Sequence, residues 1–248
     1  MYSIYAFLWF LVIMVLVIPI VIVASFFGKV NGGNIIYDAC HLWADLWMLI
    51  IGVHHKNIYE QPHNRSRPYI FVSNHISYMD VPVMMKTIRK QHFRVLGKAE
   101  LGDLPLFGFI FRKAAVSVDR QNAENRAKSM LTLQSIIKRK ISVFIFPEGT
   151  FNETGNPLKS FYDGAFKIAI ETQTPIKPIL LLDTYDRLNY KSIISLNPGR
   201  TRAVYLEETD TAGLSKNDVP YLKEKIFRQM AEGLVRYNAA WIKPEEPA

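Results

Sequence analysis

The most apolar stretch of the chain lies at its amino terminus. Positions 2 to 28 contain no Asp, Glu, Lys or Arg, and residues 4–27 are almost wholly aliphatic or aromatic. As a helix, these residues extend about 36 Å, which exceeds the roughly 30 Å hydrocarbon core of a bilayer. A cleaved signal peptide normally has a basic start and a shorter apolar region. The pattern predicts a retained membrane segment, and Pro19 leaves open a bent helix that dips into one leaflet.

A second apolar stretch, residues 42–53, is too short to span a bilayer and is interrupted by Asp45. An interfacial helix or a return hairpin fits it, and so does a helix packed on the soluble domain. We therefore divide the chain into an N-terminal membrane-embedded helical segment, residues 1–56, and an α/β domain, residues 57–248.

Beyond this segment, apolar runs of strand length alternate with stretches of helical periodicity. The expected strands are residues 69–73, 141–146, 176–182 and 202–207, and the expected helices are residues 81–90, 122–140, 165–172 and 220–241. Such alternation predicts an α/β fold with a mixed, largely parallel sheet flanked by helices, preceded by the N-terminal membrane-embedded helical segment. The last helix is amphipathic, and we expect it to dock on the domain.

The formal charge of +8 lies entirely after residue 28. An excess of this sign beside an anchor suits an anionic leaflet and phosphate-bearing substrates. The positive-inside bias and the single cysteine, Cys40, indicate a cell-membrane location with the domain on the cytoplasmic face. Nucleic acid is not an expected partner, because the chain has neither zinc-ligand spacing nor a basic helix without apolar spacing.

The strongest local signal is a histidine directly after a buried strand, His75, followed five residues later by Asp80. On one straight helix this spacing would turn the two side chains away from each other. If Asp80 instead caps a helix that begins near Val81, the chain folds back and the carboxylate reaches the imidazole. Such a pair makes a general base. Without its context, the pair would be interpreted more simply as a surface histidine and a helix cap.

The context consists of motifs that follow in a fixed order. Together with the His75 motif they resemble the motif set of the glycerol-3-phosphate and lysophosphatidate acyltransferases, and the resemblance covers about residues 65–210. The motifs are Leu96-Gly97-Lys98-Ala99-Glu100-Leu101, Val118-Asp119-Arg120, Phe146-Pro147-Glu148-Gly149-Thr150, residues 158–166 and residues 174–178.

The resemblance implies transfer of a fatty acyl group from acyl-CoA or acyl carrier protein to a lysophospholipid hydroxyl, most directly that of 1-acylglycerol-3-phosphate. His75 would act as base and Asp80 as its partner, with Arg120 on the acceptor phosphate. The acceptor site would be completed by Asn74, Lys98, Glu148, Gly149 and Thr150. Neither a cofactor nor a metal is expected, because the thioester is already activated. The chain has no Gly-x-Ser-x-Gly motif, so the nucleophile comes from the substrate.

One position departs from the family pattern. The family usually has an arginine directly after the threonine, and this chain has Phe151. Lys159, Lys98 or Lys113 could replace the missing charge, with Lys98 the first candidate. Alternatively, the acceptor is not a lysophosphatidate but, for example, an acylated amino acid with a free hydroxyl. A catalytically silent membrane scaffold is the rival of another class, and the intact His75 and Asp80 argue against it.

Other chemistry-bearing residues are interpreted structurally. We expect the remaining histidines to be surface or interfacial residues, because no carboxylates or cysteines accompany them at metal-ligand spacing; they are His41, His54, His55, His63 and His92. The acyl chain needs an apolar tunnel, for which Phe107, Phe109 and Phe111 are candidates, although a plain core role fits them equally well.

Overall fold

The computed structural model describes residues 1–118 and 123–242. In this part of the chain, the strands are β1 (Val53–Tyr59), β2 (Ile70–Ser73), β3 (Phe93–Lys98), β4 (Val116–Val118), β5 (Ser142–Ile145), β6 (Ile176–Leu181) and β7 (Gly199–Tyr205). The helices are α1 (Tyr2–Ser25), α2 (Gly33–Ile50), α3 (Asp80–Thr87), α4 (Phe107–Ala114), α5 (Ala123–Lys138), α6 (Gly164–Thr172), α7 (Thr184–Arg187) and α8 (Val219–Arg236). Three short helical turns are η1 (Gly28–Gly32), η2 (Ala99–Asp103) and η3 (Lys216–Asp218).

The strands form one seven-stranded sheet in the order β1-β7-β6-β2-β5-β3-β4. The five strands from β6 to β4 run parallel, whereas β7 is antiparallel to β6 and pairs in parallel with β1. Every residue of β2 and β5 is buried, as expected of parallel strands covered on both faces. The predicted α/β class with a mixed, largely parallel sheet is confirmed.

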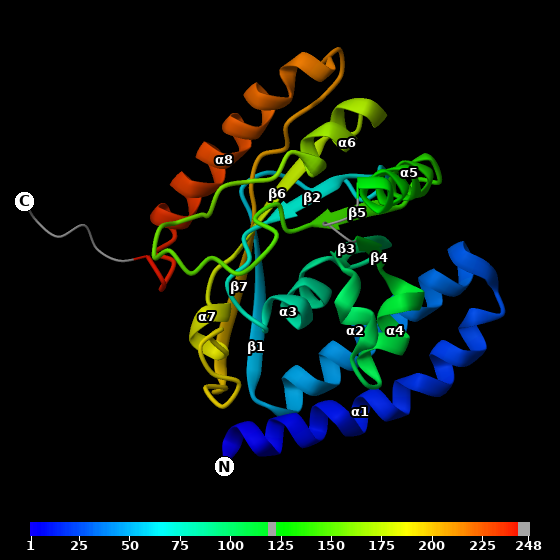
Figure 1. Ribbon diagram of the computed structural model, residues 1–248. Helices are drawn as coiled ribbons and strands as arrows, with labels where there is room; N and C mark the ends of the chain where they lie inside the picture. Colours follow the sequence, from blue (N-terminus) through cyan, green and yellow to red (C-terminus); the bar gives the residue numbers. More distant parts are fainter. Residues whose placement is uncertain (119–122, 243–248) are drawn as a thin grey trace, which may run out of the picture.

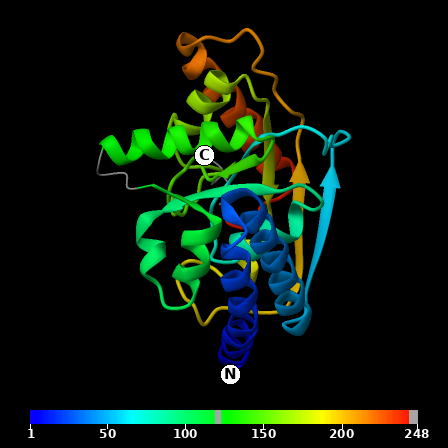
Figure 2. The ribbon, with the colours of Figure 1, turned by 90° about the vertical axis from the view of Figure 1, so that its right-hand side faces the viewer.

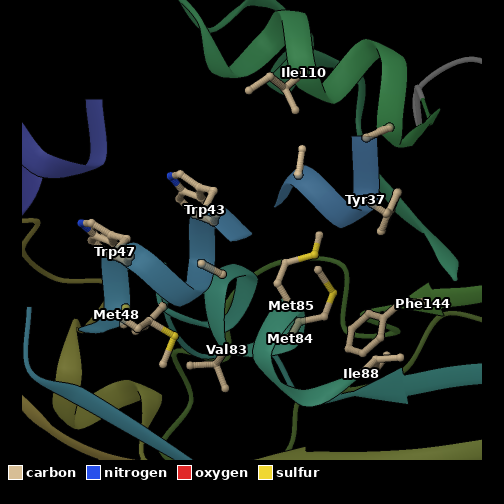
Figure 3. Close-up of a cluster of buried hydrophobic side chains, with 14 of the residues drawn as sticks. Tyr37, Trp43, Trp47, Met48, Val83, Met84, Met85, Ile88, Ile110 and Phe144 are labelled. Atoms are coloured by element: carbon tan, nitrogen blue, oxygen red, sulfur yellow. The ribbon is translucent and has the colours of Figure 1, made fainter. Parts of the chain in front are cut away.

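Helices cover both faces of the sheet, and the two sets of helices form separate apolar cores (Figure 1). On one face lie α5, α6 and α8, which bury side chains such as Leu133, Phe166 and Ile226 in one apolar core. On the other face lie α1 to α4, which form a second core (Figure 3). In that core, the Trp43 ring of α2 stacks on Trp47 and meets Phe10 of α1 edge to face at 5.2 Å.

The helices α1 and α2 lie side by side and are joined by η1 (Figure 2). Glycine is required in this turn, because a Cβ on Gly32 would stand 2.1 Å from the Ala24 carbonyl oxygen. The indole of Trp47 donates a hydrogen bond of 2.8 Å to the Ala6 carbonyl and ties the two helices together. Among the described residues, α1 is the one helix long and apolar enough to cross a membrane, judged by length and composition.

The second apolar stretch forms the end of α2 and the start of β1. The helix α2 returns along α1, as expected of a return hairpin, and it also packs on α3 and α4, as expected of a helix packed on the domain. Both alternatives therefore hold for the same helix. The expected strands coincide with β2, β5, β6 and β7, whereas β1, β3 and β4 were not predicted. In β1 two histidines, a lysine and an asparagine obscure the apolar pattern, and pairing with β7 makes the segment a strand. This strand crosses the predicted domain boundary at residue 56.

Candidate active site

The centre of the site is the loop that follows β2, which carries His75. The ring nitrogen Nδ1 of His75 lies 2.8 Å from Asp80 Oδ2, so the contact predicted from the His75 to Asp80 spacing is present. Asp80 is fully buried, while the His75 side chain remains 20% exposed. A carboxylate on Nδ1 favours the tautomer with the proton on that nitrogen. The lone pair of Nε2 is then available to accept a proton.

Asp80 does not cap its helix as expected. It is the first residue of α3, and its carboxylate points back to the preceding loop. There Oδ2 accepts hydrogen bonds from the backbone N–H groups of Ile76 at 2.8 Å and Ser77 at 2.9 Å, in addition to His75. The carboxylate therefore fixes the loop and the imidazole together, because three donors converge on one oxygen. Its other oxygen, Oδ1, is buried without a hydrogen-bond partner among the described residues.

Glu148, expected at the acceptor site, is also fully buried. Its two carboxylate oxygens accept the backbone N–H groups of His75 and Lys159, each at 2.8 Å. Burial raises the pKa of Glu148 to about 8, and the two N–H donors oppose this rise. Because each oxygen accepts a backbone N–H group, Glu148 positions the His75 loop, and its expected contact with the acceptor stays a prediction.

Asn74 has a similar role. Its side-chain amide exchanges two hydrogen bonds of 2.9 Å with the backbone of Leu181 and so connects the end of β2 to β6. The side chain is buried and is not part of the cavity wall beside His75. These bonds give Asn74 a positioning role, because both polar atoms of the amide are paired, and its expected contact with substrate stays a prediction.

The turn after β5 brings Thr150 to the same place. Gly149 adopts a positive φ of 75°, which glycine tolerates without steric cost, and its N–H donates to the Phe146 carbonyl at 3.1 Å. Lys159 Nζ donates to the Thr150 hydroxyl at 2.7 Å. Gly149 and Thr150 both line the cavity beside His75. The Lys159 ammonium group therefore lies next to the part of the cavity wall formed by Thr150.

Phe151, which stands where the family usually has arginine, is in contact with the base. Its ring meets the His75 ring edge to face at 4.5 Å and the Tyr78 ring at 4.9 Å. On the other side, the His75 ring stacks on Phe146 at 4.1 Å. The imidazole is thus enclosed by aromatic rings, which restrict its orientation.

An apolar cavity of about 490 Å³ is lined by His75 and extends to the N-terminal helices. Its wall includes Met14 and Val17 of α1 and Trp43 of α2, which sequence reasoning did not identify. Of the expected tunnel phenylalanines, Phe107 and Phe111 line it, and Phe109 packs against the core beside it. The volume is in the range of ligand-binding pockets. The wall combines residues far apart in the sequence, so only the fold could reveal it.

The three lysines considered as substitutes for the missing arginine are separated by the structure. Lys98 is exposed at the end of β3 and lines the cavity, and Lys159 is bonded to Thr150. Lys113 lines a different groove. Arg120 lies outside the described residues, so its predicted contact with the acceptor stays a prediction.

The remaining histidines do not converge on a common site. His55, for instance, is largely buried between Thr201 and Asn57, and burial lowers its pKa to about 4. Among the residues that the structure describes, no three His, Cys, Asp or Glu side chains are grouped so that they could hold a metal ion.

Comparison with known proteins places this site in a family. A model of the acyltransferase family matches residues 51–182. The 1-acyl-sn-glycerol-3-phosphate acyltransferase alpha of Mus musculus is 32% identical over 173 residues, which cover 66% of this chain and 58% of that protein. The beta form of Homo sapiens is 31% identical over 167 residues, which cover 66% of this chain and 59% of that protein. The match thus spans less than two thirds of these relatives.

A solved structure shares the fold. The crystal structure of the 1-acyl-sn-glycerophosphate acyltransferase PlsC from Thermotoga maritima superimposes with a TM-score of 0.69 over 98% of this chain and 100% of that chain, at 20% identity. At this identity the likeness concerns the fold alone. Because the family model covers more than half of the sequence, and the His75 and Asp80 motif lies within it, this chain belongs to the acyltransferase family.

Proposed function

We propose that this protein transfers a fatty acyl group from acyl-CoA or acyl carrier protein to the free hydroxyl of 1-acylglycerol-3-phosphate, giving phosphatidate. The observation that carries the proposal is the His75 ring, whose Nδ1 is held by buried Asp80 while the ring lines an apolar cavity. The names of the relatives support the choice of acceptor.

The chemical step needs one base. His75 Nε2 takes the proton of the acceptor hydroxyl while the hydroxyl oxygen attacks the thioester carbonyl carbon, and Asp80 stabilises the imidazolium. When the tetrahedral intermediate collapses, the carbon–sulfur bond breaks and the imidazolium returns the proton to the departing sulfur. The acyl chain occupies the apolar cavity, where each buried methylene contributes about 0.8 kcal/mol.

Cations near the cavity suit an acceptor phosphate. Lys98 lines the cavity directly, and Lys159 reaches it through Thr150. A lysine is a suitable point charge for phosphate, whereas the arginine that this chain lacks at position 151 would bind it with two hydrogen bonds. By the family resemblance, Arg120 adds the guanidinium.

We place the protein at the cell membrane with its catalytic domain on the cytoplasmic face, and the outer face of α1 supports the attachment to a membrane. Side chains such as Leu8, Leu16 and Val23 are more than half exposed on this helix. Because α1 also lines the cavity, a lipid acceptor can reach His75 from the bilayer, and the two-tailed product can return to the bilayer.

A second acceptor class is favoured by Phe151. Its ring occupies space beside His75 in which an arginine would bind phosphate, so an O-acyltransferase acting on an acylated amino acid or another lysolipid is the alternative.

Acceptor profiling of the purified protein in vesicles tests the proposal. We expect thioester consumption with lysophosphatidate, and Phe151→Arg should preserve or improve it, with Phe151→Leu as the control for loss of the ring. Ready acylation of a hydroxylated aminolipid without any use of lysophosphatidate would replace the acceptor and leave the chemistry at His75 untouched. If no thioester were consumed with any of the acceptors, the catalytically silent scaffold would be favoured.

A further inference from the structure

The positive charge of the chain is concentrated in one segment. Residues 89–140 contain twelve Lys and Arg and four Asp and Glu, so their excess of +8 equals that of the whole chain. The other parts of the sequence are neutral overall. A general preference for anionic surfaces would not require this concentration.

Described residues of this segment, together with residues between Ser25 and Ile36, line a groove of about 1060 Å³ along β4, at the edge of the sheet. Among the residues that the structure places, six cations line the groove, namely Lys29, Arg94, Arg112, Lys113, Lys128 and Arg139. None of the described residues lining it is an Asp or a Glu. Hydroxyl groups of α5, including Ser129, Thr132 and Ser135, complete the wall. Cations combined with hydroxyls are the groups that bind phosphate oxygens.

Arg94 is the buried cation of the groove, with 4% of its surface exposed. Its guanidinium donates to the Phe93 carbonyl and to Asn34 Oδ1, each at 2.9 Å, and to the Val30 carbonyl at 3.3 Å, and it lies over the Tyr37 ring. Among the described residues it has no carboxylate partner, although a buried charge is costly without one. Gly33 makes room for it, because a Cβ there would stand 2.4 Å from the guanidinium.

The groove adjoins the apolar cavity. Ala114 and Ala115 line both, and the neighbouring residues Lys98 and Ala99 line the cavity and the groove, respectively. A ligand that spans the two would place an apolar chain in the cavity and phosphates in the groove.

We propose that the groove binds the nucleotide phosphates of a coenzyme A thioester and holds the soluble end of the acyl donor. This inference rests on the proposed function. A nucleotide can enter the groove and contact cations on both of its walls, whereas a flat leaflet contacts only the cations at the rim. The nucleotide part of coenzyme A carries several phosphates, which matches several cations in one groove.

The test is binding of coenzyme A itself to the full chain in nanodiscs, measured by titration calorimetry. Lys113→Glu combined with Lys128→Glu reverses two exposed charges on α4 and α5, on either side of β4. We expect the Kd for coenzyme A to rise about tenfold or more. Lys216→Glu combined with Lys225→Glu makes the same charge change on exposed lysines of η3 and α8, which do not line the groove, and should leave it unchanged.

Kinetic measurements distinguish the phosphates of coenzyme A from other phosphate-bearing ligands, such as anionic lipids. The groove variant should raise KM for palmitoyl-CoA and leave KM for palmitoyl-pantetheine, which lacks the nucleotide, unchanged. Unchanged coenzyme A binding would overturn the proposal, whether the variant weakened attachment to phosphatidylglycerol vesicles or use of acyl carrier protein. Groove-dependent coenzyme A binding by a protein that acylates no acceptor would support the site and refute the proposed function.

Discussion

The helices α1 and α8 cover opposite faces of one sheet, yet their outer surfaces differ. In α8, Leu222, Ile226 and Met230 are buried, and charged side chains such as Lys225 face outward. In α1 the outward face is itself apolar, with Leu8 57% and Leu16 65% exposed. Burial within the protein explains the apolar residues of α8 but only part of those of α1. The difference agrees with the proposed membrane location, in which the exposed apolar face of α1 would contact lipid.

The cavity follows the same division. Its described wall comes from α1 to α4, from β3 and η2, and from the loops after β2 and β5, and no residue of α5, α6 or α8 contributes to it. His75 therefore stands at the border between a hydrogen-bonded loop and an apolar layer. The hydrogen-bonded loop orients His75 for proton transfer, and the apolar layer provides space for an acyl chain.

The largest expected effect comes from removing the base and leaving both faces intact. His75→Ala should lower turnover by about 10²- to 10⁴-fold, since a positioned general base contributes about this much. Asp80→Asn should do nearly the same. Acyl transfer is measured on protein whose circular dichroism and vesicle binding match those of the unaltered chain. Near-normal turnover in a well-folded His75→Ala protein would refute the assignment.

Charges on the outer face of α1 should abolish the contrast with α8. Leu8→Glu combined with Leu16→Glu forfeits the burial of two leucines in lipid, worth about 1.5 kcal/mol or more each, so vesicle partitioning should fall about 10²-fold. The measurement is flotation with vesicles. Tyr221→Glu, at an exposed aromatic residue of α8, is the matched control and should have no effect. Equal losses in both proteins would mean that α1 is not the attachment face.

Filling the cavity from α2 should shorten the preferred acyl chain. Cys40 lines the cavity, and Cys40→Phe should displace about two methylenes, at about 0.8 kcal/mol each. The kcat/KM for a sixteen-carbon donor should then fall about 15-fold relative to a ten-carbon donor. Cys40→Ala controls for loss of the thiol and should keep the preference for long chains. An unchanged chain-length profile in the phenylalanine variant would place the acyl chain elsewhere.

The smallest effect concerns the hydrogen-bonded loop. In the fold, Glu148 stays protonated up to about pH 8, whereas its usual pKa is 4.5. Between these values the folded chain binds more protons than the unfolded chain, so stability falls as pH rises, by up to about 1.4 kcal/mol per pH unit. The Glu148→Gln protein should be less stable than the unaltered protein at low pH, because glutamine keeps only one oxygen to accept the two backbone N–H groups. Its stability should also lack this dependence on pH.

Denaturant titrations of both proteins from pH 5 to 8 measure this effect. His55 makes stability change with pH in the opposite direction. Its pKa is lowered to about 4, so between this value and its usual pKa the folded chain binds fewer protons than the unfolded chain, and stability rises with pH. His55 is present in both proteins, so their difference isolates Glu148. Parallel pH profiles would show that Glu148 is ionised in the fold.

The sequence predicted the parts of this site that depend on local order. A buried strand followed by His75, with Asp80 at the start of a helix, sets a short loop in which the two can meet. The sequence did not reveal that Glu148 and Asn74 are buried and position that loop, because each pairs with a residue remote in sequence, Glu148 with His75 and Asn74 with Leu181. Strand β1 was missed for the same reason, since its partner β7 is remote in sequence.

The most direct test of the central claim, that the acyl chain lies on the α1 side of the sheet with His75 at its reactive end, is photo-crosslinking. An acyl-CoA with a diazirine at the far end of its chain is bound to the His75→Ala protein in vesicles, irradiated, and mapped by mass spectrometry. The account predicts labels on Met14, Val17 or Trp43. Labelling confined to α5, α6 or α8 would contradict it.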